Sequence, residues 1–275
     1  LDAEPTFASL FPKRTSVRSI QRAVDREALP VLPRQFLAIV EGPMGEGKTE
    51  AAEVLALRLA WAGGCQGFYF ALPTIATSNQ MYGRVRELLA TVNPHNEQVL
   101  LALVNGMAEF HPDVEAALRR GPAAPTHGEE QRVAFDSWYL PRKRSLLTAY
   151  GVGTIDQALL AGLATRHVGL RLLGLAGKCV IIDEVHAYDL YMSTILDRLL
   201  EWLKELGASV ILLSATLPAE RRAELVRAFA GENAELPSSG ETSGAEAPYP
   251  LVTLAEPGGA VRALPCGAAA RSMSV

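Results

Sequence analysis

One stretch of this sequence combines glycines, a lysine and a threonine at the spacing that binds the phosphates of a nucleotide. It matches the pattern G-x-x-x-x-G-K-[ST] at every fixed position, through Gly42, Pro43, Met44, Gly45, Glu46, Gly47, Lys48 and Thr49. Glycines let successive backbone N–H groups turn toward an anion, and the helix that follows adds partial positive charge. Lys48 can reach the β- and γ-phosphates, and the Thr49 hydroxyl can ligate the accompanying magnesium ion. These residues predict a site for a nucleoside triphosphate with Mg²⁺.

A glycine-rich turn that happens to precede a lysine is the alternative interpretation, and the flanking residues argue against it. Residues 36–41 are mostly apolar, which is typical of a buried parallel strand. Residues 50–61 are rich in Ala, Leu and Glu, which favour a helix. A strand before the loop and a helix after it are the context that a phosphate loop requires.

Two adjacent carboxylates supply the second half of such a site. Asp183 and Glu184 follow the apolar run 178–182. Asp183 would hold magnesium, usually through its water shell, and Glu184 would orient and deprotonate the attacking water. Acidic residues at a helix N-terminus are the alternative, since the helix dipole favours them there. The presence of Lys48 upstream favours the catalytic interpretation.

Four other polar residues are candidates for supporting roles. His186, Ser214 and Thr216 could couple the nucleotide site to a nucleic-acid contact, although a lone histidine is more often structural and the hydroxyls could cap the helix after Pro218. Gln21 offers the donor and acceptor that reading an adenine edge requires. A single glutamine is usually an ordinary surface residue, but the position of Gln21 upstream of the phosphate loop favours a role in nucleotide binding.

The elements that must position these residues alternate between strand and helix. Apolar runs predict strands at 36–41, 67–72, 99–104, 145–150, 178–183 and 209–213. Helices are predicted at 50–61, 77–89, from about 156 to 164, after 186 up to Gly207, and at 218–230. This order predicts an α/β fold with a mostly parallel sheet and helices on both faces, and such sheets bind ligands at the carboxyl ends of their strands.

Composition divides the chain into three parts. Residues 1–35 contain several prolines, and residues 36–230 form the α/β domain. Residues 231–275 shift to Gly, Pro, Ser, Ala and Glu with only a weak strand pattern at 251–254, which predicts a linker or partly disordered tail. Within the domain, 107–144 breaks the rhythm and is interpreted as a surface insertion, partly helical at 113–120.

Bulk properties narrow the class of protein. The net charge of −4 means that nucleic acid would bind a local groove rather than a global positive field. No apolar run approaches the length of a membrane span. The three cysteines are far apart and lack metal-ligand spacing, which suits the cytoplasm. The chain begins with Leu, so we expect a piece of a longer protein.

These motifs together resemble the first motor lobe of superfamily-2 DExH-type helicases, which implies a RecA-like P-loop NTPase fold. More narrowly, VGTIDQALLAGL (152–163), LAGKCVIIDEVHAYDLYM (175–192) and ILLSATLP (211–218) resemble the CRISPR-associated helicase-nucleases of type I systems. The resemblance covers about residues 15–230. It implies ATP and Mg²⁺ as cofactors, Gln21 as the adenine reader, and CRISPR antiviral defence as the biological role.

The resemblance also implies contacts to single-stranded DNA. They would be made by Pro73, Thr74, Asn105, Gly106, Gly153, Thr154 and Asp156, largely through backbone and hydroxyl groups on phosphates. The segment 138–144 (WYLPRKR), with Arg142 and Arg144, is a further candidate, and a solvated basic loop is the simpler interpretation of it.

The chain departs from the family's pattern in two ways. No histidine is followed by aspartate, so the paired metal ligands of the family's nuclease domain are not in this sequence. The second lobe, which supplies the arginines that reach the γ-phosphate, is not in it either, so we expect weak hydrolysis by this fragment alone. The implied partners are the RNA-guided surveillance complex and the missing nuclease domain and second lobe. A different DExH motor on RNA or DNA, or a non-catalytic scaffold, remain the alternatives.

Overall fold

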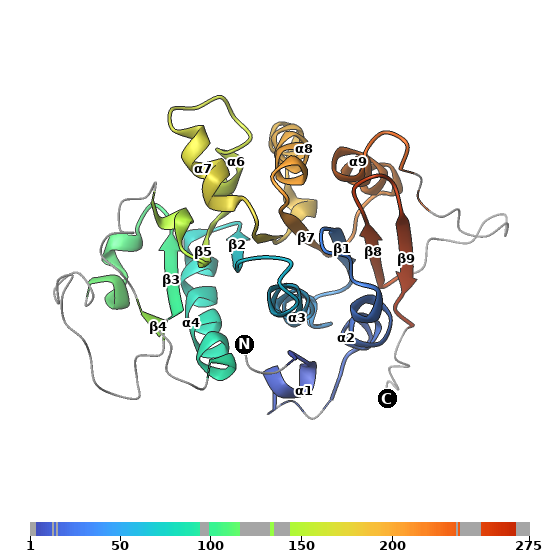
Figure 1. Ribbon diagram of the computed structural model, residues 1–275, viewed down its shortest axis with the longest axis horizontal. Coiled ribbons are helices and arrows are strands. Elements are labelled where there is room, and N and C mark those ends of the chain that lie inside the picture. Colours follow the sequence, from blue (N-terminus) through green and yellow to red (C-terminus); the bar gives the residue numbers. More distant parts are fainter. Residues whose placement is uncertain are drawn as a thin grey trace, which may run out of the picture.

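A sheet of nine strands forms the centre of the molecule, in the order β4-β3-β5-β2-β6-β7-β1-β8-β9 (Figure 1). The computed structural model describes residues 4–12, 14, 16–93, 99–115, 133–134, 144–234, 236 and 249–267. Neighbouring strands from β4 to β1 are parallel, whereas β8 is antiparallel to β1 and β9 is antiparallel to β8. The predicted α/β class with a mostly parallel sheet is confirmed.

The strands are short, and four central ones are buried from end to end. Their bounds are Leu37–Glu41 (β1), Phe68–Leu72 (β2), Val99–Val104 (β3), Val133–Ala134 (β4), Tyr150–Thr154 (β5), Cys179–Ile182 (β6), Ser209–Ser214 (β7), Leu251–Ala255 (β8) and Val261–Pro265 (β9). Because helices cover both faces, β1, β2, β6 and β7 are mostly continuous apolar runs rather than alternating patterns.

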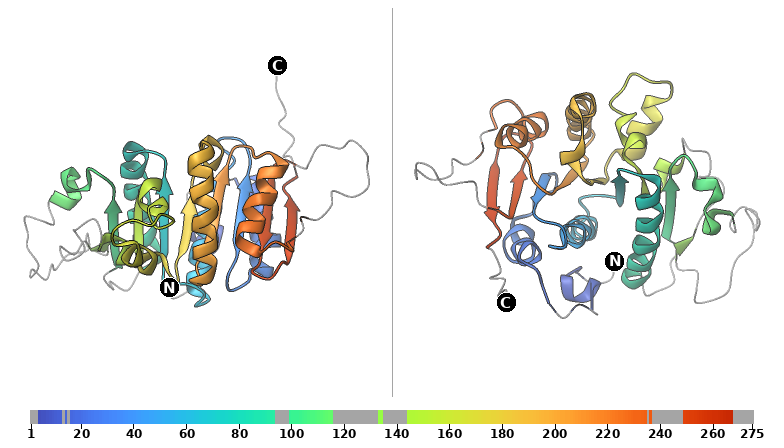
Figure 2. Two further views of the ribbon diagram at one scale, coloured as in Figure 1. Left: turned by 90° about the horizontal axis from the view of Figure 1, so that it is seen from above. Right: turned by 180° about the vertical axis from the view of Figure 1, so that it is seen from behind.

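Helices form a layer on each side of the sheet (Figures 1 and 2). One layer holds α1 (Phe7–Leu10), α2 (Ser19–Ala23), α3 (Lys48–Trp61) and α4 (Ile75–Val92), and the other holds α6 (Ile155–Leu159), α7 (Val168–Leu175), α8 (Leu190–Glu205) and α9 (Ala219–Ala230). Side chains of β1 divide between the two cores: Ala38 and Val40 pack with α3, and Leu37 and Ile39 pack with α8 and α9. In the described part of the chain, no helix has the length and hydrophobicity needed to cross a membrane.

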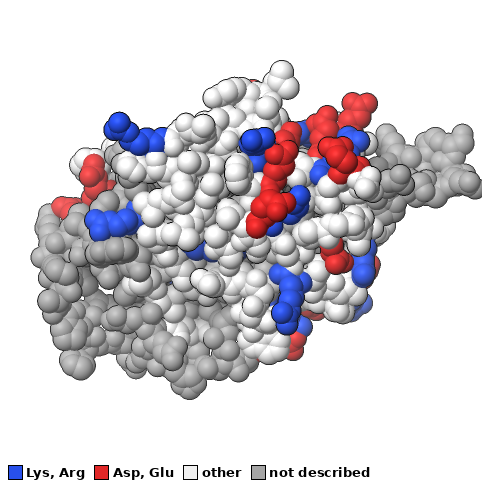
Figure 3. Space-filling view, turned by 45° about the horizontal axis from the view of Figure 1, so that its top comes forward, with Lys and Arg blue, Asp and Glu red and all other residues white. Residues whose placement is uncertain are grey.

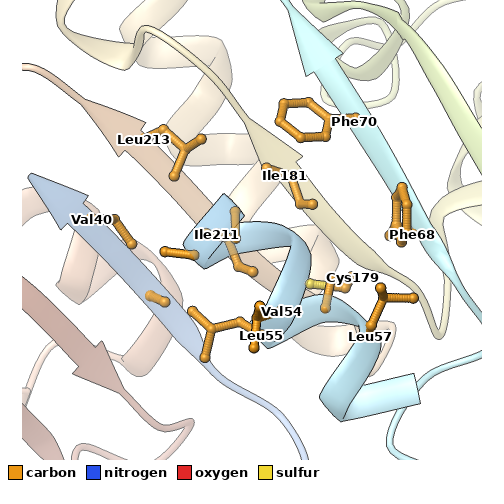
Figure 4. Packing of buried hydrophobic residues seen from close by; sticks show 14 of the residues in the cluster. Val40, Val54, Leu55, Leu57, Phe68, Phe70, Cys179, Ile181, Ile211 and Leu213 are labelled. Carbon is orange, nitrogen blue, oxygen red and sulfur yellow. The ribbon is translucent and has the colours of Figure 1, made fainter. Parts of the chain in front are cut away.

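Helix α3, which carries the phosphate-binding lysine at its start, is deeply buried. Val54, Leu55 and Leu57 pack against side chains of β1, β2, β6 and β7 (Figure 4). Even Glu50 and Glu53 are buried, so this helix has no polar face to solvent along most of its length. The rigid packing of α3 fixes the position of the loop that precedes it.

Strand β5 begins later than the sequence predicted. The apolar stretch 145–150 was the expected strand, but residues 145–147 form a 3₁₀ turn and the strand is Tyr150–Thr154. Two glycines explain the difference, because they make room for a neighbouring ring. A Cβ on Gly151 would lie 3.0 Å from the Tyr69 ring, and one on Gly153 would lie 2.1 Å from Val104 O and 2.5 Å from Tyr69 Oη. Glycine in a strand marks this kind of close approach.

Part of the predicted tail belongs to the sheet, and this corrects the expectation of a linker throughout 231–275. Strands β8 and β9 form an antiparallel hairpin beside β1, in which Val252 pairs with Val40. The buried residues of β8 join both cores. The weak strand pattern at 251–254 thus corresponds to β8, and its pairing with β1 and β9 places it in the sheet.

The predicted insertion 107–144 lies largely outside the described residues. Within it, residues 112–115 are helical, which agrees with the start of the helix predicted at 113–120, and 116–120 are outside the description. Strand β4 pairs with β3 in parallel, so the insertion also contributes the edge of the sheet.

The glycines of the domain allow a paired test of packing. We expect Gly153→Ala to lower the free energy of unfolding by at least ~2 kcal/mol, because the new methyl group meets backbone and a buried ring. Gly83→Ala, at a helical position with nothing within 4 Å, should instead raise it by about 0.5–1 kcal/mol. Urea unfolding of both variants measures this, and equal effects would contradict the packing described.

Candidate functional site

The sheet order brings the two halves of the predicted nucleotide site together. Strands β6, β7 and β1 are neighbours, and their register aligns Ile182 with Leu212 and Ser214 with Glu41. Because the three strands are parallel, their carboxyl ends meet at one edge of the sheet. Gly42, Asp183 and Ala215 are the residues that directly follow these strands.

The phosphate loop already has the backbone shape that an anion site needs. Gly45 and Gly47 have φ of +81° and +78°, in the left-handed region that glycine adopts at no steric cost. Gly47 is the N-cap residue of α3. The Lys48 ammonium donates hydrogen bonds to Gly42 O (2.6 Å) and Pro43 O (3.1 Å), so loop carbonyls hold it at the start of the loop.

Lys48 lies within the electrostatic reach of both carboxylates. Burial lowers the pKa of Lys48, and Glu184, Asp183 and Glu46 oppose that effect by favouring the charged ammonium. The lysine from one strand end and the carboxylates from another therefore lie close enough to interact.

Helix α2 packs directly against the phosphate loop. The Gln21 side chain is buried and lies so close to Gly47 that a Cβ there would be 2.1 Å from Gln21 Nε2. Gln21 Oε1 accepts a hydrogen bond from Arg18 N (2.9 Å), and the Ser19 hydroxyl donates to Glu46 Oε2 (3.3 Å). Pro43 and the exposed Met44 complete the loop. The candidate adenine reader is thus a neighbour of the phosphate-binding segment.

The two carboxylates at the end of β6 are held by the backbone. Asp183 N donates to Ala71 O (3.0 Å), and Asp183 Oδ1 accepts from Glu184 N (2.9 Å). Burial, reinforced by the adjacent Glu184 charge, raises the pKa of Asp183 to about 6. Glu184 has a φ of +56°, an uncommon conformation for a residue with a side chain. Such a crowded, partly desolvated carboxylate pair favours a cation as neighbour.

His186 links this pair to the turn after β7. Its Nε2 lies 3.3 Å from Glu184 Oε2, and its Nδ1 accepts a hydrogen bond from Ala215 N (3.2 Å). Since Nδ1 is an acceptor, the imidazole proton is assigned to Nε2, facing Glu184. The hydroxyls of Ser214 and Thr216 are candidates for coupling the nucleotide site to a nucleic-acid contact, and contact with the carboxylates would be one way to do so. In the structure, the Ser214 hydroxyl instead donates to Thr216 O (3.0 Å), and Thr216 is exposed.

The residues proposed for DNA contact lie at the ends of β2, β3 and β5, which are adjacent in the sheet. Pro73 and Thr74 are exposed after β2, and the Thr74 hydroxyl caps α4 by accepting from Thr77 N (3.1 Å). Asn105 is buried after β3, where its amide donates to Ser78 Oγ and Asn79 Oδ1 (both 2.9 Å). Asn105 therefore ties the end of β3 to the start of α4.

The remaining candidates differ in accessibility. Gly153 and Thr154 are buried, and the Thr154 carbonyl accepts a hydrogen bond from the Tyr69 hydroxyl (3.1 Å). Asp156 is exposed in the first turn of α6, and Gly106 is partly buried. Arg142 lies outside the described residues, whereas Arg144 immediately precedes the 3₁₀ turn.

Sequence reasoning missed a buried ion pair beside the phosphate loop. Glu41 is 2% exposed, and its carboxylate accepts from Arg222 Nε (2.5 Å), Arg222 Nη2 (2.9 Å) and Leu217 N (3.1 Å). The Tyr249 hydroxyl, on the segment leading to β8, donates to Ala215 O (2.9 Å). A glutamate ending an otherwise apolar strand was the available signal for Glu41, whereas Arg222 sits in an ordinary amphipathic helix.

Comparison with known proteins supplies independent findings. No family model matches the chain. The CRISPR-associated endonuclease/helicase Cas3 of Thermus thermophilus is 43% identical over 263 residues, which cover 94% of this chain and 27% of the relative. The Cas3 protein of Escherichia coli K12 is 36% identical over 214 residues, covering 77% of this chain and 23% of the relative.

Solved structures agree with the sequence matches. T. fusca Cas3 with ATP superposes with a TM-score of 0.81 at 36% identity, over 97% of this chain and 30% of that chain. A CRISPR RNA-guided surveillance complex in a pre-nicking state matches with a TM-score of 0.63 at 31% identity, over 94% of this chain and 26% of that chain. The chain thus spans less than a third of the length of these relatives. By sequence and by fold, it is a homologue of the Cas3 helicase–nucleases, and the part of them that it matches is a RecA-like first motor lobe.

Proposed function

We propose that this chain is the ATP-binding lobe of a motor that translocates along single-stranded DNA in CRISPR antiviral defence. The observation that carries the proposal is the convergence of the phosphate loop, the Asp183–Glu184 pair and the turn after β7 at one edge of the sheet. Structures of T. fusca Cas3 with ADP, AMPPNP and ATP support a nucleotide at the corresponding lobe.

In this function each residue of the site has a distinct role. The loop amides between Gly42 and Thr49 bind the phosphates, and Lys48 exchanges its carbonyl partners for phosphate oxygens. Gln21 reads the adenine, and Glu184 orients and deprotonates the attacking water. His186 couples Glu184 to the turn at Ala215, because one ring nitrogen contacts the Glu184 carboxylate and the other accepts a hydrogen bond from Ala215 N.

The donor atoms present fit a magnesium ion. Thr49 offers a hydroxyl oxygen and Asp183 a carboxylate, and hard oxygen ligands suit Mg²⁺, which binds proteins through one or two carboxylates plus phosphates. The raised pKa of Asp183 is consistent with a site whose negative charges are unbalanced without a cation. The ion would neutralise charge on the phosphates, while the protein residues supply position and the base.

The DNA path that we propose crosses the ends of β2, β3 and β5, next to the nucleotide site. Pro73, Thr74 and Asp156 are its exposed candidates, and Asn105 fixes the backbone that borders it. The opposite-charge pairs over α8 and α9, such as Arg221 with Asp197 and Glu224, alternate in sign and provide no continuous basic surface there (Figure 3). The proposed track is therefore the edge formed by the ends of β2, β5 and β3, where the candidate residues lie.

Partners and location follow from the same proposal. A second motor lobe and a nuclease domain, in cis or in trans, would complete the machine, and the RNA-guided surveillance complex would load it on DNA. The lone lobe would hydrolyse ATP weakly, because the arginines that stabilise the transition state come from elsewhere.

The free thiols of Cys65, Cys179 and Cys266 suit the reducing cytoplasm. A non-catalytic scaffold is less favoured, since the phosphate loop and both carboxylates are intact.

The phosphate site is tested by removing its ammonium group. We expect Lys48→Ala to weaken MgATP binding at least tenfold and to abolish hydrolysis, because charge-assisted hydrogen bonds to phosphate are lost. Asp183→Ala should remove the magnesium dependence of binding. Lys204→Ala, near the end of α8, is the matched control. Calorimetric titration measures the affinities, and wild-type affinity in Lys48→Ala would reject the site.

The crowded carboxylates predict a pH-dependent stability. Folding raises the pKa of Asp183 from 3.8 to about 6, so its ionised form costs stability above pH 6 and none below about 4. We expect Asp183→Asn to raise the free energy of unfolding at pH 7.5 by about 1–3 kcal/mol without nucleotide, and to have little effect near pH 4. Asp25→Asn, at an exposed position, should show no such gain. Destabilisation by Asp183→Asn at pH 7.5 would contradict the electrostatics.

The choice of nucleic acid needs a protein that contains both lobes. In such a protein we expect single-stranded DNA to stimulate ATP hydrolysis at least about tenfold more than RNA of the same sequence. Greater stimulation by RNA would favour an RNA-directed DExH motor instead. Binding of the lone lobe to the surveillance complex irrespective of ATP, with no stimulation in either case, would favour the scaffold.

A further inference from the structure

The buried pair Glu41–Arg222 has no role in the nucleotide chemistry proposed above, although it lies beside it. Glu41 ends β1 and directly precedes the first residue of the phosphate loop. Arg222 comes from α9, on the helical layer opposite α3, and only 11% of its side chain is exposed (Figure 1). Removing a charged pair from water is costly, so stability by itself is a weak reason for placing one here.

The pair is fastened to the end of one short turn, residues 214–217, and the residue that follows Glu41 is fastened to its start. At the start of the turn, Ser214 O accepts a hydrogen bond from Gly42 N (3.2 Å). At its end, Leu217 N donates to Glu41 Oε1 (3.1 Å), and Leu217 O accepts from Arg222 Nη2 (3.4 Å). Glu41 and Gly42, which are consecutive, therefore hold the two ends of the turn, and the Tyr249 hydroxyl holds Ala215 O between them.

The middle of this turn determines how the water-activating carboxylate is held. Ala215 N donates to His186 Nδ1, and His186 Nε2 faces Glu184 Oε2. A shift of the turn would move the amide that selects the tautomer of His186. The path from Glu41 to Glu184 thus runs through a hydrogen bond to Leu217, along the backbone to Ala215, and through a hydrogen bond to His186, whose Nε2 lies beside Glu184.

We propose that Glu41 and Arg222 are positioning residues, which set the turn 214–217 so that His186 presents its Nε2 proton to Glu184. The inference rests on the proposed function, because it gives Glu184 the role of base. It adds that the strand leading into the phosphate loop also aligns the base on the neighbouring strand. The Glu41 carboxylate would thereby connect the segment that binds phosphate to the residue that activates water.

The test replaces the ion pair by an apolar pair, Glu41→Leu with Arg222→Met. Buried ion pairs replaced in this way often keep their stability, so positioning and folding can be separated. The control is Asp197→Leu with Arg221→Met. That pair is also bidentate, with both bonds at 2.8 Å, and joins α9 to α8 through Arg221, the residue before Arg222. Among the described contacts it makes no hydrogen bond to the turn or the phosphate loop.

Two measurements on the nucleotide-free and metal-free chain report the geometry directly. The ¹⁵N shifts of the His186 ring give its tautomer, and hydrogen exchange gives the protection of the Ala215 amide. We expect the chain with the apolar pair to show mixed tautomers of His186 and exchange of Ala215 at least about tenfold faster, with both values unchanged in the control. A single Nε2–H tautomer and native protection in the test chain would overturn the inference, as would equal changes in the control.

A third measurement connects the geometry to the reaction. With MgATP, the test chain should bind nucleotide within about threefold of the parent affinity while single-turnover hydrolysis falls at least about tenfold. Unchanged hydrolysis would overturn the inference. If the parent chain failed to bind ATP, the proposed function would fall, whereas the tautomer and exchange results would still decide whether the pair positions His186.

A conservative variant covers the case in which the apolar pair prevents folding. Arg222→Lys keeps a cation beside Glu41 but cannot make the bidentate contact. We expect it to fold and to give the same loss of tautomer selection, and a native His186 spectrum in this variant would also count against the inference.

Discussion

Parallel pairing among β6, β7 and β1 is the constraint on which the rest of the structure depends. It aligns Glu41 with Ser214 and brings the residues after each strand to one edge of the sheet. Without this register, Lys48 and Asp183 would have no reason to share an electrostatic environment, because they are far apart in the chain. The buried faces of the strands enforce the register, because a shift by one residue would exchange the two cores that cover the sheet.

The edge that results gathers partly buried charges of both signs. Lys48 donates to loop carbonyls, Asp183 is held partly desolvated beside Glu184, and Glu184 adopts a left-handed backbone conformation. Burial of the Lys48 and Asp183 charges and the backbone conformation of Glu184 each cost stability. A cation with a polyphosphate would relieve them together, which is the usual relation between strain and function at a binding site.

The same edge divides into two regions according to strand order. The ends of β6, β7 and β1 carry the nucleotide residues, and the ends of β2, β5 and β3 carry the residues proposed for DNA. Because β2 lies directly beside β6, the two regions are adjacent, and Asp183 N even donates to Ala71 O of β2. A change at the carboxylates therefore has a short path to the proposed DNA track.

The amino-acid sequence by itself determined the phosphate loop, the acidic pair, the α/β class and the helix that ends before Gly207, because these depend on local spacing and periodicity. Only the tertiary structure decided the start of β5, which depends on the Tyr69 ring beside two glycines, and the hairpin of β8 and β9, which depends on pairing with β1. It alone revealed the partners of Glu41 and His186. The physical reason is that these contacts join residues distant in sequence, whose meeting is set by strand order and burial and leaves no periodic signal in the chain.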